Sequence, residues 1–239
     1  MQRAIALLDA LAAAPGGLGT NEAARRIGAS PATASRLLAT LADGGLVRRE
    51  AADGPWRLGL HLVALSEGAL AGLDVRDVAR PHLRTLAEAT GESVTLSLPG
   101  GGEAVTVDFV PAPSSVVSVA RLGRPSVLHA TATGKAMLAF GDAPLPETPL
   151  ETFTPATITD PAALAADVDA TRRRGHAESV GEREPDLAAL AAPVRARDGS
   201  LAAIIGVQGP AGRFDAGRRA AALPDLLAAA AAIARALGG

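Results

Sequence analysis

The segment HATATGK, which ends at Lys135, contains the glycine–lysine pair of a phosphate-binding loop. A Walker A loop also needs a glycine at its first position for a tight turn, and a serine or threonine directly after the lysine to bind magnesium. Those two positions hold His129 and Ala136. We therefore expect no nucleotide at this segment, because both the turn and the magnesium ligand are missing.

The same segment predicts the start of a helix. Thr131 and Thr133 are good capping residues for a helix that begins near Gly134. A helix N-terminus presents free N–H groups and a positive partial charge, which together suit a carboxylate. This turn is therefore a candidate seat for a small acidic ligand.

Metal and catalytic chemistry find little support in the sequence. The chain has no cysteine, which excludes disulfides, thiolate catalysis and cysteine-ligated zinc. Its four histidines, at 61, 82, 129 and 176, lack the spacing of a zinc site. No Gly-x-Ser-x-Gly elbow or Ser-His-Asp set stands out, and we interpret the acids of 147–151 and 182–186 as solvated loops. We expect no metal, no cofactor and no enzymatic activity.

Side chains that could bind nucleic acid are present on a helix predicted over residues 31–42. Its apolar positions face inward, and the residues left outside are Ala32, Thr33, Ser35, Arg36 and Thr40. Arg36 can pair with guanine, Thr33 and Ser35 can reach bases or phosphates, and Ala32 can touch a thymine methyl group. The alternative is an ordinary helical pair in which Arg36 is simply solvated.

Apolar spacing and capping residues define the helices that precede this one. An apolar stripe that includes Ile5 predicts a helix over 2–14, and a second, short helix spans about 20–27. Ser30 can cap the third helix, and Pro31 is tolerated at its first position. Two helices joined by a tight turn are the arrangement that places a recognition helix in the major groove.

A basic hairpin is expected after the third helix. Two short strands flank Asp53-Gly54 and carry Arg48, Arg49 and Arg57. A wing of this kind touches the DNA backbone or the minor groove. Residues 1–58 carry a net charge of +2 and the remaining residues −4, a modest asymmetry that a small DNA-binding module would leave. The sequence therefore predicts a winged helix-turn-helix over residues 1–58.

The rest of the chain predicts a linker helix and an α+β domain. Apolar spacing is helical over 59–73, and the domain that follows spans 74–239. One antiparallel sheet flanked by helices is expected. Its strands are predicted at 92–98, 103–110, 115–120, 176–180, 188–196 and 201–208, and its helices at 74–90, 131–140, 161–174 and from 215 onward.

Three segments together resemble the IclR family of bacterial transcription regulators. The first is RAIALLDALAAAPGGLGTNEAARRIGASPATASRLLATLADGGLVRREAADGPWRLG, which is similar to the DNA-binding domain of that family. The others are LGRPSVLHATATGKAMLA and RRRGHAESVGEREPDLAALAAPVRARDGSLAAIIGVQGP, which are similar to its effector-binding domain. The resemblance implies a winged helix, a linker helix and a GAF-like domain that binds a small molecule. It also implies dimers or tetramers on pseudo-palindromic operators.

The resemblance further implies a set of effector contacts. Around the turn before the predicted helix they are Ala132, Thr133 and Gly134; across the pocket they are Ser179, Ala189, Gly206 and Gln208. The alternative for each of these residues is that it only packs in the sheet and does not contact the ligand. We favour a buried hydrogen-bond anchor for Glu182, without ligand contact, and a structural hydrogen bond for His129.

The chain departs from the family pattern at Val127, at His176 and at Asp186, and its loop over 141–153 looks shortened. His176 and Asp186 are expected near the pocket, where they could alter the choice of ligand. The identity of the effector therefore cannot be inferred from the effector of a relative.

We expect a cytoplasmic regulator whose partners are a double-stranded DNA operator and a small organic effector, a carboxylate or an aromatic acid. A homodimer or homotetramer is expected, and no membrane span, because no apolar run is long enough. Two alternatives stay open: a small-molecule-processing enzyme fused to a DNA-binding head, and a DNA-binding protein that needs no effector.

Overall fold

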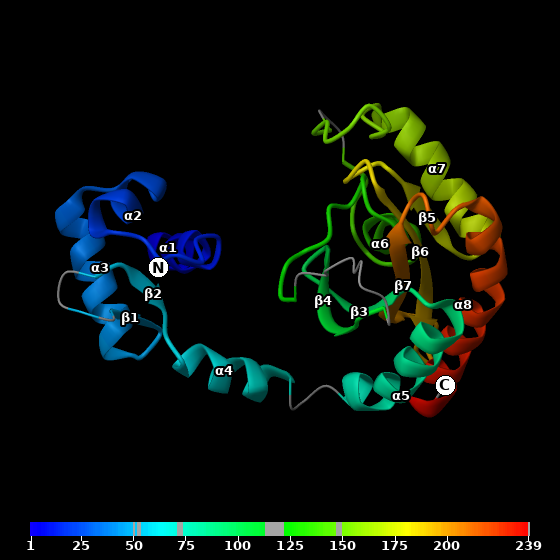
Figure 1. The fold of residues 1–239 in the computed structure, drawn as a ribbon, viewed down its shortest axis with the longest axis horizontal. Coiled ribbons are helices and arrows are strands. Elements are labelled where there is room, and N and C mark those ends of the chain that lie inside the picture. Colours follow the sequence, from blue (N-terminus) through cyan, green and yellow to red (C-terminus); the bar gives the residue numbers. More distant parts are fainter. Residues whose placement is uncertain (50, 52–53, 71–73, 113–121, 147–149, 239) are drawn as a thin grey trace. The chain divides into compact units, whose positions relative to one another are not determined.

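The computed structural model describes residues 1–239 except 50, 52–53, 71–73, 113–121, 147–149 and 239. The chain divides into two compact units, Met1–Leu73 and Asp74–Gly239. Figure 1 labels their helices and strands, and each unit is described by itself. No helix among the described residues is long and apolar enough to cross a membrane.

The first unit contains three helices, a two-stranded hairpin and a further helix. They are α1 (Gln2–Ala12), α2 (Thr20–Arg26), α3 (Pro31–Asp43), β1 (Val47–Arg49), β2 (Trp56–Leu58) and α4 (His61–Leu70). The helices predicted over 2–14, 20–27 and 31–42 are confirmed to within two residues at their ends. Helix α4 is shorter than the linker helix predicted over 59–73, whose last three positions lie outside the described residues. The Ser30 side chain accepts a hydrogen bond from the Thr33 backbone N–H, with Pro31 in the first turn.

Leucine and alanine side chains from α1, α2 and α3 form the core of this unit, together with Val47 of β1. Leu7 and Leu11 of α1 are buried, whereas Ile5 is 56% exposed. The prediction that Ile5 belongs to the buried stripe is therefore wrong, because the helix turns its Leu7–Leu11 side to the core. Trp56 joins the hairpin to α2 by donating from Nε1 to the Thr20 hydroxyl at 3.1 Å.

The second unit is an α+β domain, as the sequence predicts. Its elements are α5 (Asp74–Thr90), β3 (Ser93–Gly100), β4 (Glu103–Val110), α6 (Ala132–Phe140), α7 (Pro161–Arg174), β5 (Ala177–Val180), β6 (Leu187–Arg195), β7 (Leu201–Pro210) and α8 (Ala216–Ala236). The strands form one antiparallel sheet in the order β4-β3-β7-β6-β5. The strand predicted at 115–120 lies outside the described residues.

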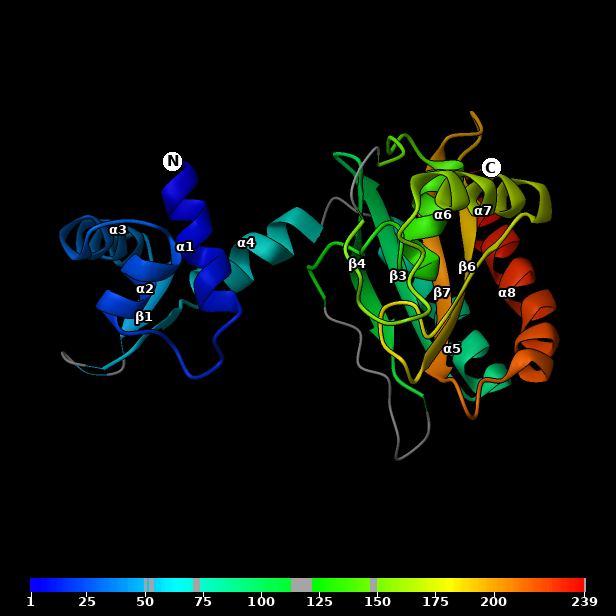
Figure 2. The same ribbon diagram turned by 90° about the horizontal axis from the view of Figure 1, so that it is seen from above.

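Helices cover both faces of this sheet (Figure 2). On one face α5 and α8 pack together over the sheet and bury the larger apolar core. On the other face α6 packs on the sheet, and α7 packs on α6. The central strands are therefore buried on both sides. On β3, Val94 and Leu96 face the core under α5 and α8, whereas the buried Ser93, Thr95 and Ser97 lie on the opposite face. The ends of β5, β6 and β7 come close to the N-terminus of α6.

Candidate functional site

Helix α3 presents most of its predicted contact residues to solvent. Ala32, Ser35, Arg36 and Thr40 are exposed, while Thr33 is half-buried. The Thr33 hydroxyl lies 3.0 Å from that of Ser30, and the Thr40 hydroxyl donates to the Arg36 carbonyl at 3.0 Å. In the described part of the chain, the Arg36 side chain forms no ion pair, so its guanidinium is presented on an open helix face. DNA contact by these residues stays a prediction.

The arginines of the hairpin differ in their surroundings. Arg48 and Arg49 are exposed on β1, and the Arg49 guanidinium carbon lies 4.6 Å from the centre of the Trp56 ring. Arg57 on β2 is half-buried and donates to the Pro15 carbonyl at 2.9 Å. This bond ties the turn after α1 to the hairpin, which gives Arg57 a structural role besides the predicted contact with DNA.

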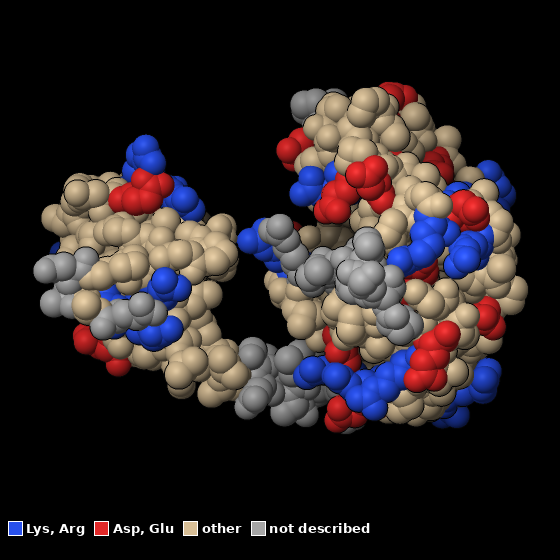
Figure 3. Space-filling model, viewed as in Figure 1, with Lys and Arg blue, Asp and Glu red and all other residues tan. Residues whose placement is uncertain are grey.

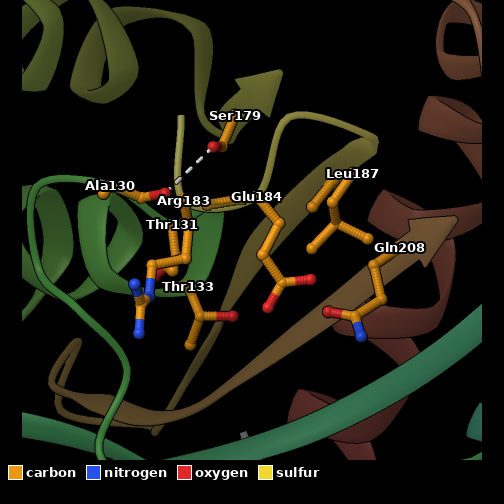
Figure 4. Close-up of a pocket in the computed structure, with 10 residues that line it drawn as sticks. Ala130, Thr131, Thr133, Ser179, Arg183, Glu184, Leu187 and Gln208 are labelled. Carbon is orange, nitrogen blue, oxygen red and sulfur yellow. Dashed lines mark hydrogen bonds between the residues drawn. The ribbon is translucent and has the colours of Figure 1, made fainter. Parts of the chain in front are cut away.

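A small cavity opens in the second unit where α6 begins. Its volume is about 50 Å³. Backbone and side chains from α6, β5, the loop after β5, β6 and β7 surround it (Figure 4). The residues that line it are Ala130, Thr131, Ala132, Thr133, Ser179, Arg183, Glu184, Leu187, Ala189 and Gln208.

The N-terminus of α6 forms one wall of the cavity. The Thr131 side chain accepts from the Gly134 backbone N–H at 2.9 Å and donates to the Val127 carbonyl at 2.8 Å. Among the hydrogen bonds of the described residues, the backbone N–H groups of Ala132 and Thr133 find no acceptor. These two donors and the positive end of the helix suit a carboxylate, as the sequence predicts for this turn.

Not all of the predicted effector residues line the cavity. Ala132, Thr133, Ser179, Ala189 and Gln208 do, and their contact with an effector stays a prediction. Gly134 and Gly206 lie next to it but outside its lining. A Cβ atom on Gly134 would lie 2.2 Å from the Val127 carbonyl oxygen, and one on Gly206 would lie 2.7 Å from the Thr95 hydroxyl. Both glycines therefore provide close packing around the cavity.

Arg183 and Glu184 are cavity residues that the sequence analysis interpreted as part of a solvated loop. Both side chains are exposed to solvent, as that interpretation predicts, and both also contribute to the lining of the cavity. The Arg183 guanidinium carbon lies 4.0 Å from the centre of the Phe153 ring. His176 and Asp186, which were expected near the pocket, are not part of its lining.

The single lysine of the chain is buried behind this wall. Lys135 is 2% exposed, and its Nζ lies 2.8 Å from Glu182 Oε1 and 3.0 Å from Asp167 Oδ2. Burial raises the pKa of Glu182 above its ordinary value, although the positive charge of Lys135 opposes this shift. Lys135 therefore joins α6 to α7 and to the loop that carries Arg183.

The backbone around Glu182 is held as well. Its carbonyl accepts from the Thr157 hydroxyl at 2.6 Å, and the Thr154 hydroxyl donates to the Gly181 carbonyl at 2.6 Å. Glu182 is thus the buried anchor that the sequence predicts. His129 has the predicted structural role too, since its Nε2 lies 2.8 Å from the Glu151 carbonyl oxygen.

Acidic and basic side chains are mixed over the face of the second unit in Figure 3. Among the described residues, no group of three or more histidine, aspartate or glutamate side chains could hold a metal ion. The lining of the cavity instead offers hydroxyl, amide, guanidinium and carboxylate groups, from Thr131, Thr133, Ser179, Arg183, Glu184 and Gln208.

Comparison with known proteins gives matches over nearly the whole chain. Residues 1–51 match the family model described as the IclR helix-turn-helix domain. Residues 67–235 match the model described as the bacterial transcriptional regulator IclR C-terminal domain. A curated relative, the HTH-type transcriptional regulator BhcR of Paracoccus denitrificans, is 34% identical over 96% of this chain and 84% of its own length.

Solved structures give the same result. The structure of IclR from Thermotoga maritima is 30% identical, with a TM-score of 0.74 over 100% of this chain and 98% of that one. An IclR homologue from Microbacterium hydrocarbonoxydans, crystallised in complex with 4-hydroxybenzoate, is 25% identical, with a TM-score of 0.82 over 99% of this chain and 98% of that one.

Proposed function

The chain belongs to the IclR family of bacterial transcriptional regulators, and we infer that it is a DNA-binding regulator whose affinity for its operator is controlled by a small organic effector. The observation that carries this inference is the match of both family domains in one chain. Its relatives are named as transcriptional regulators, which supports a role without catalysis. A regulator of this kind acts in the cytoplasm, where bacterial DNA is found.

Recognition of DNA is assigned to the exposed face of α3. The N-terminal part of a recognition helix reaches base edges in the major groove, and the exposed Arg36 has the donors to read a guanine. Arg48 and Arg49 on the hairpin add contacts to the phosphate backbone or the minor groove.

The effector is assigned to the cavity at the start of α6. The open N–H groups of Ala132 and Thr133 and the cation of Arg183 favour a carboxylate. In a relative from Microbacterium hydrocarbonoxydans, the bound molecule is 4-hydroxybenzoate, which also carries a carboxylate.

Control of DNA affinity requires that the effector prefer one conformation of the sensor domain. Residues 59–73, the predicted linker helix, lead directly into α5, and Arg80 of α5 donates to both carboxylate oxygens of the buried Asp108 on β4, at 3.1 and 3.0 Å. Through this contact, a change in the sheet on effector binding would move α5 and, with it, the linker residues that precede α5.

We propose that the protein acts as a homodimer or homotetramer. Two recognition helices must reach half-sites about one helical turn apart, or a multiple of it. Leu60, just before α4, is 77% exposed, and Leu65 on α4 is 50% exposed. Burial of these side chains against a second copy of the chain would favour association.

In vitro selection of genomic DNA fragments by the purified protein tests this function. Enriched fragments should share two related half-sites, and adding a small organic acid should change their retention. An Arg36→Ala variant serves as the control and should enrich them poorly. Recovery of the input mixture without any shared sequence would contradict DNA recognition.

A further inference from the structure

Helix α8 carries almost no charge on the side that faces solvent. Over residues 220–234 its only charged residue is Asp225, although the alanines at 220, 221, 228 and 231 are exposed and Leu227 is 38% exposed. The outer side of α5, which packs beside α8 on the same face of the sheet, carries the exposed Arg84 and Glu88 instead. A helix that is apolar all round is usually buried. The outer side of α8 is therefore suited to be covered by a partner.

A regular seam runs along this outer side. It consists of residues that follow one another at alternating spacings of four and three: Ala221, Asp225, Ala228, Ala232 and Arg235. This spacing keeps a row of side chains against a second helix in a coiled coil. All of these residues are exposed except Ala232, which is half-buried. Because alanine has only a methyl group, the seam allows the backbone of a second helix to approach closely.

A groove of about 240 Å³ lies between α8 and α5, along one side of the seam. The residues that line it are Asp225, Ala228, Ala229 and Ala232 of α8 and His82, Thr85, Leu86 and Ala89 of α5. Helix α8 lies at the outer side of the second unit (Figure 1). A helix laid along the seam would therefore reach the groove without displacing any other element of this unit.

The two charged residues of the seam indicate that the partner is a second copy of the chain. Asp225 and Arg235 are both exposed, and in the described part of the chain neither forms an ion pair. They are separated by about 15 Å along the helix axis, at 1.5 Å per residue. When two copies of α8 pack antiparallel about a twofold axis at the level of residue 230, Asp225 lies opposite Arg235 of the second copy.

The same axis places Ala228 opposite Ala232 of the second copy. The twofold symmetry repeats both contacts, so the seam is complementary to itself, as the interface of a symmetric dimer must be. Parallel packing would instead place Asp225 against Asp225 and Arg235 against Arg235. Like charges that face each other across an interface disfavour association, so the charges select the antiparallel arrangement.

We propose that α8 is an interface between two copies of this chain, formed by antiparallel packing of the two helices along the seam. The proposal rests on the homo-oligomer proposed above, and it assigns one contact of that assembly to the second unit. The interface pairs Asp225 with Arg235 at each end and alanines with alanines at its centre.

Sedimentation velocity of the full-length protein over a range of concentrations tests this interface. Ala228→Glu places a carboxylate at the centre of the seam, and Asp225→Arg places like charges opposite each other. Each variant should reduce the mass of the assembly to one half, or raise the dissociation constant of that step about tenfold or more. Ala166→Glu, at an exposed position within α7, is the matched control and should sediment like the wild type.

An exchange of charges tests the pairing itself. Arg235→Asp should weaken association as Asp225→Arg does. The double variant Asp225→Arg with Arg235→Asp has opposite charges at both ends of the seam again and should associate like the wild type. An equimolar mixture of the two single variants should also associate, because each chain then faces the opposite charge on its partner. A role of either residue within its own helix would not produce this recovery.

The proposal would be overturned by Ala228→Glu and Asp225→Arg assemblies with the mass of the wild type, or by a double variant and a mixture that both stay dissociated. A wild type that is monomeric at every concentration would overturn it together with the proposed homo-oligomer. Operator binding by the same proteins is measured by fluorescence anisotropy. Binding that still responds to an effector acid leaves the inferred regulatory function standing when the interface on α8 fails.

Discussion

Thr133 and Gly134 are neighbours at the start of α6, and they serve the cavity in different ways. Thr133 lines it, whereas Gly134 faces the preceding loop, where a Cβ atom would lie 2.2 Å from the Val127 carbonyl oxygen. Resemblance to the family implied ligand contact for both residues. A glycine has no side chain to reach a ligand, and its contribution here is the close approach of two backbone segments.

Gly134→Ala is therefore expected to destabilise the second unit. The added methyl group meets backbone atoms that cannot rotate away, which costs about 1–3 kcal/mol in a packed interior. Gly212→Ala is the control, because nothing lies within 4 Å of a Cβ atom at that position. Denaturant unfolding measures both variants, and equal midpoints for the two would contradict the packing role of Gly134.

Arg36 carries the most specific prediction at the DNA surface. Loss of a bidentate contact to guanine in Arg36→Ala should weaken operator binding by about 1–3 kcal/mol. The substitution should leave the fold unaffected, because Arg36 is exposed on α3. Fluorescence anisotropy with a labelled operator measures the change, with Arg173→Ala as the control for lost positive charge. Unchanged affinity would remove Arg36 from base recognition.

The sequence could not predict Arg183 and Glu184 as cavity residues. Charged side chains in a short loop are usually solvated, and a sequence pattern does not tell which side of a loop faces a cavity. Thr131 was found because helix capping is a local property of the chain, and its side chain caps α6. Thr133, which was also expected to cap this helix, instead lies in its first turn, since α6 begins at Ala132. Local signals therefore located one wall of the cavity and missed the wall that the tertiary fold supplies.

At the scale of elements, the limits of α3 and α7 were predicted well because the residues that start and end these helices act locally. Ser30 and Asp160 cap α3 and α7, and Gly175 ends α7 in the left-handed conformation, with φ of 79°. The contact between Lys135 and Glu182 spans 47 residues in sequence. The sequence indicated an anchor at Glu182, but only the fold brings α6, α7 and the β5–β6 loop around one lysine.

The buried position of Glu182 predicts a dependence of stability on pH. Burial raises its folded-state pKa above the ordinary 4.5, so the folded protein binds this proton more tightly than the unfolded chain. The stability that Glu182 contributes is therefore fully present below pH 4.5 and is lost as the pH rises through its raised folded-state pKa.

Glu182→Gln removes this titration. The unfolding free energy of the wild type minus that of Glu182→Gln should fall as the pH rises from 4.5, as measured by urea unfolding at a series of pH values. Glu88→Gln, at an exposed position on α5, should give a difference that does not change in this way. A wild-type advantage that grows with pH would contradict the raised pKa of Glu182.

At the scale of the whole molecule, the chain joins a unit in which one face of α3 is exposed to a unit with a small cavity at the start of α6. The net charges of +2 for residues 1–58 and −4 for the remainder gave only weak support to DNA binding. The two family domains in one chain explain why these units are joined. Their coupling requires that binding of effector and of DNA each change the affinity for the other.

Anisotropy titration of a labelled operator, with and without a saturating effector acid, tests this coupling most directly. The wild type should show a change in Kd of about 5-fold to 150-fold on adding the acid, the usual range of coupling between two sites. Thr133→Phe, which fills the cavity beside α6, should bind the operator like the acid-free wild type and should not respond to the acid. An identical Kd with and without an acid that calorimetry shows to be bound would contradict the account.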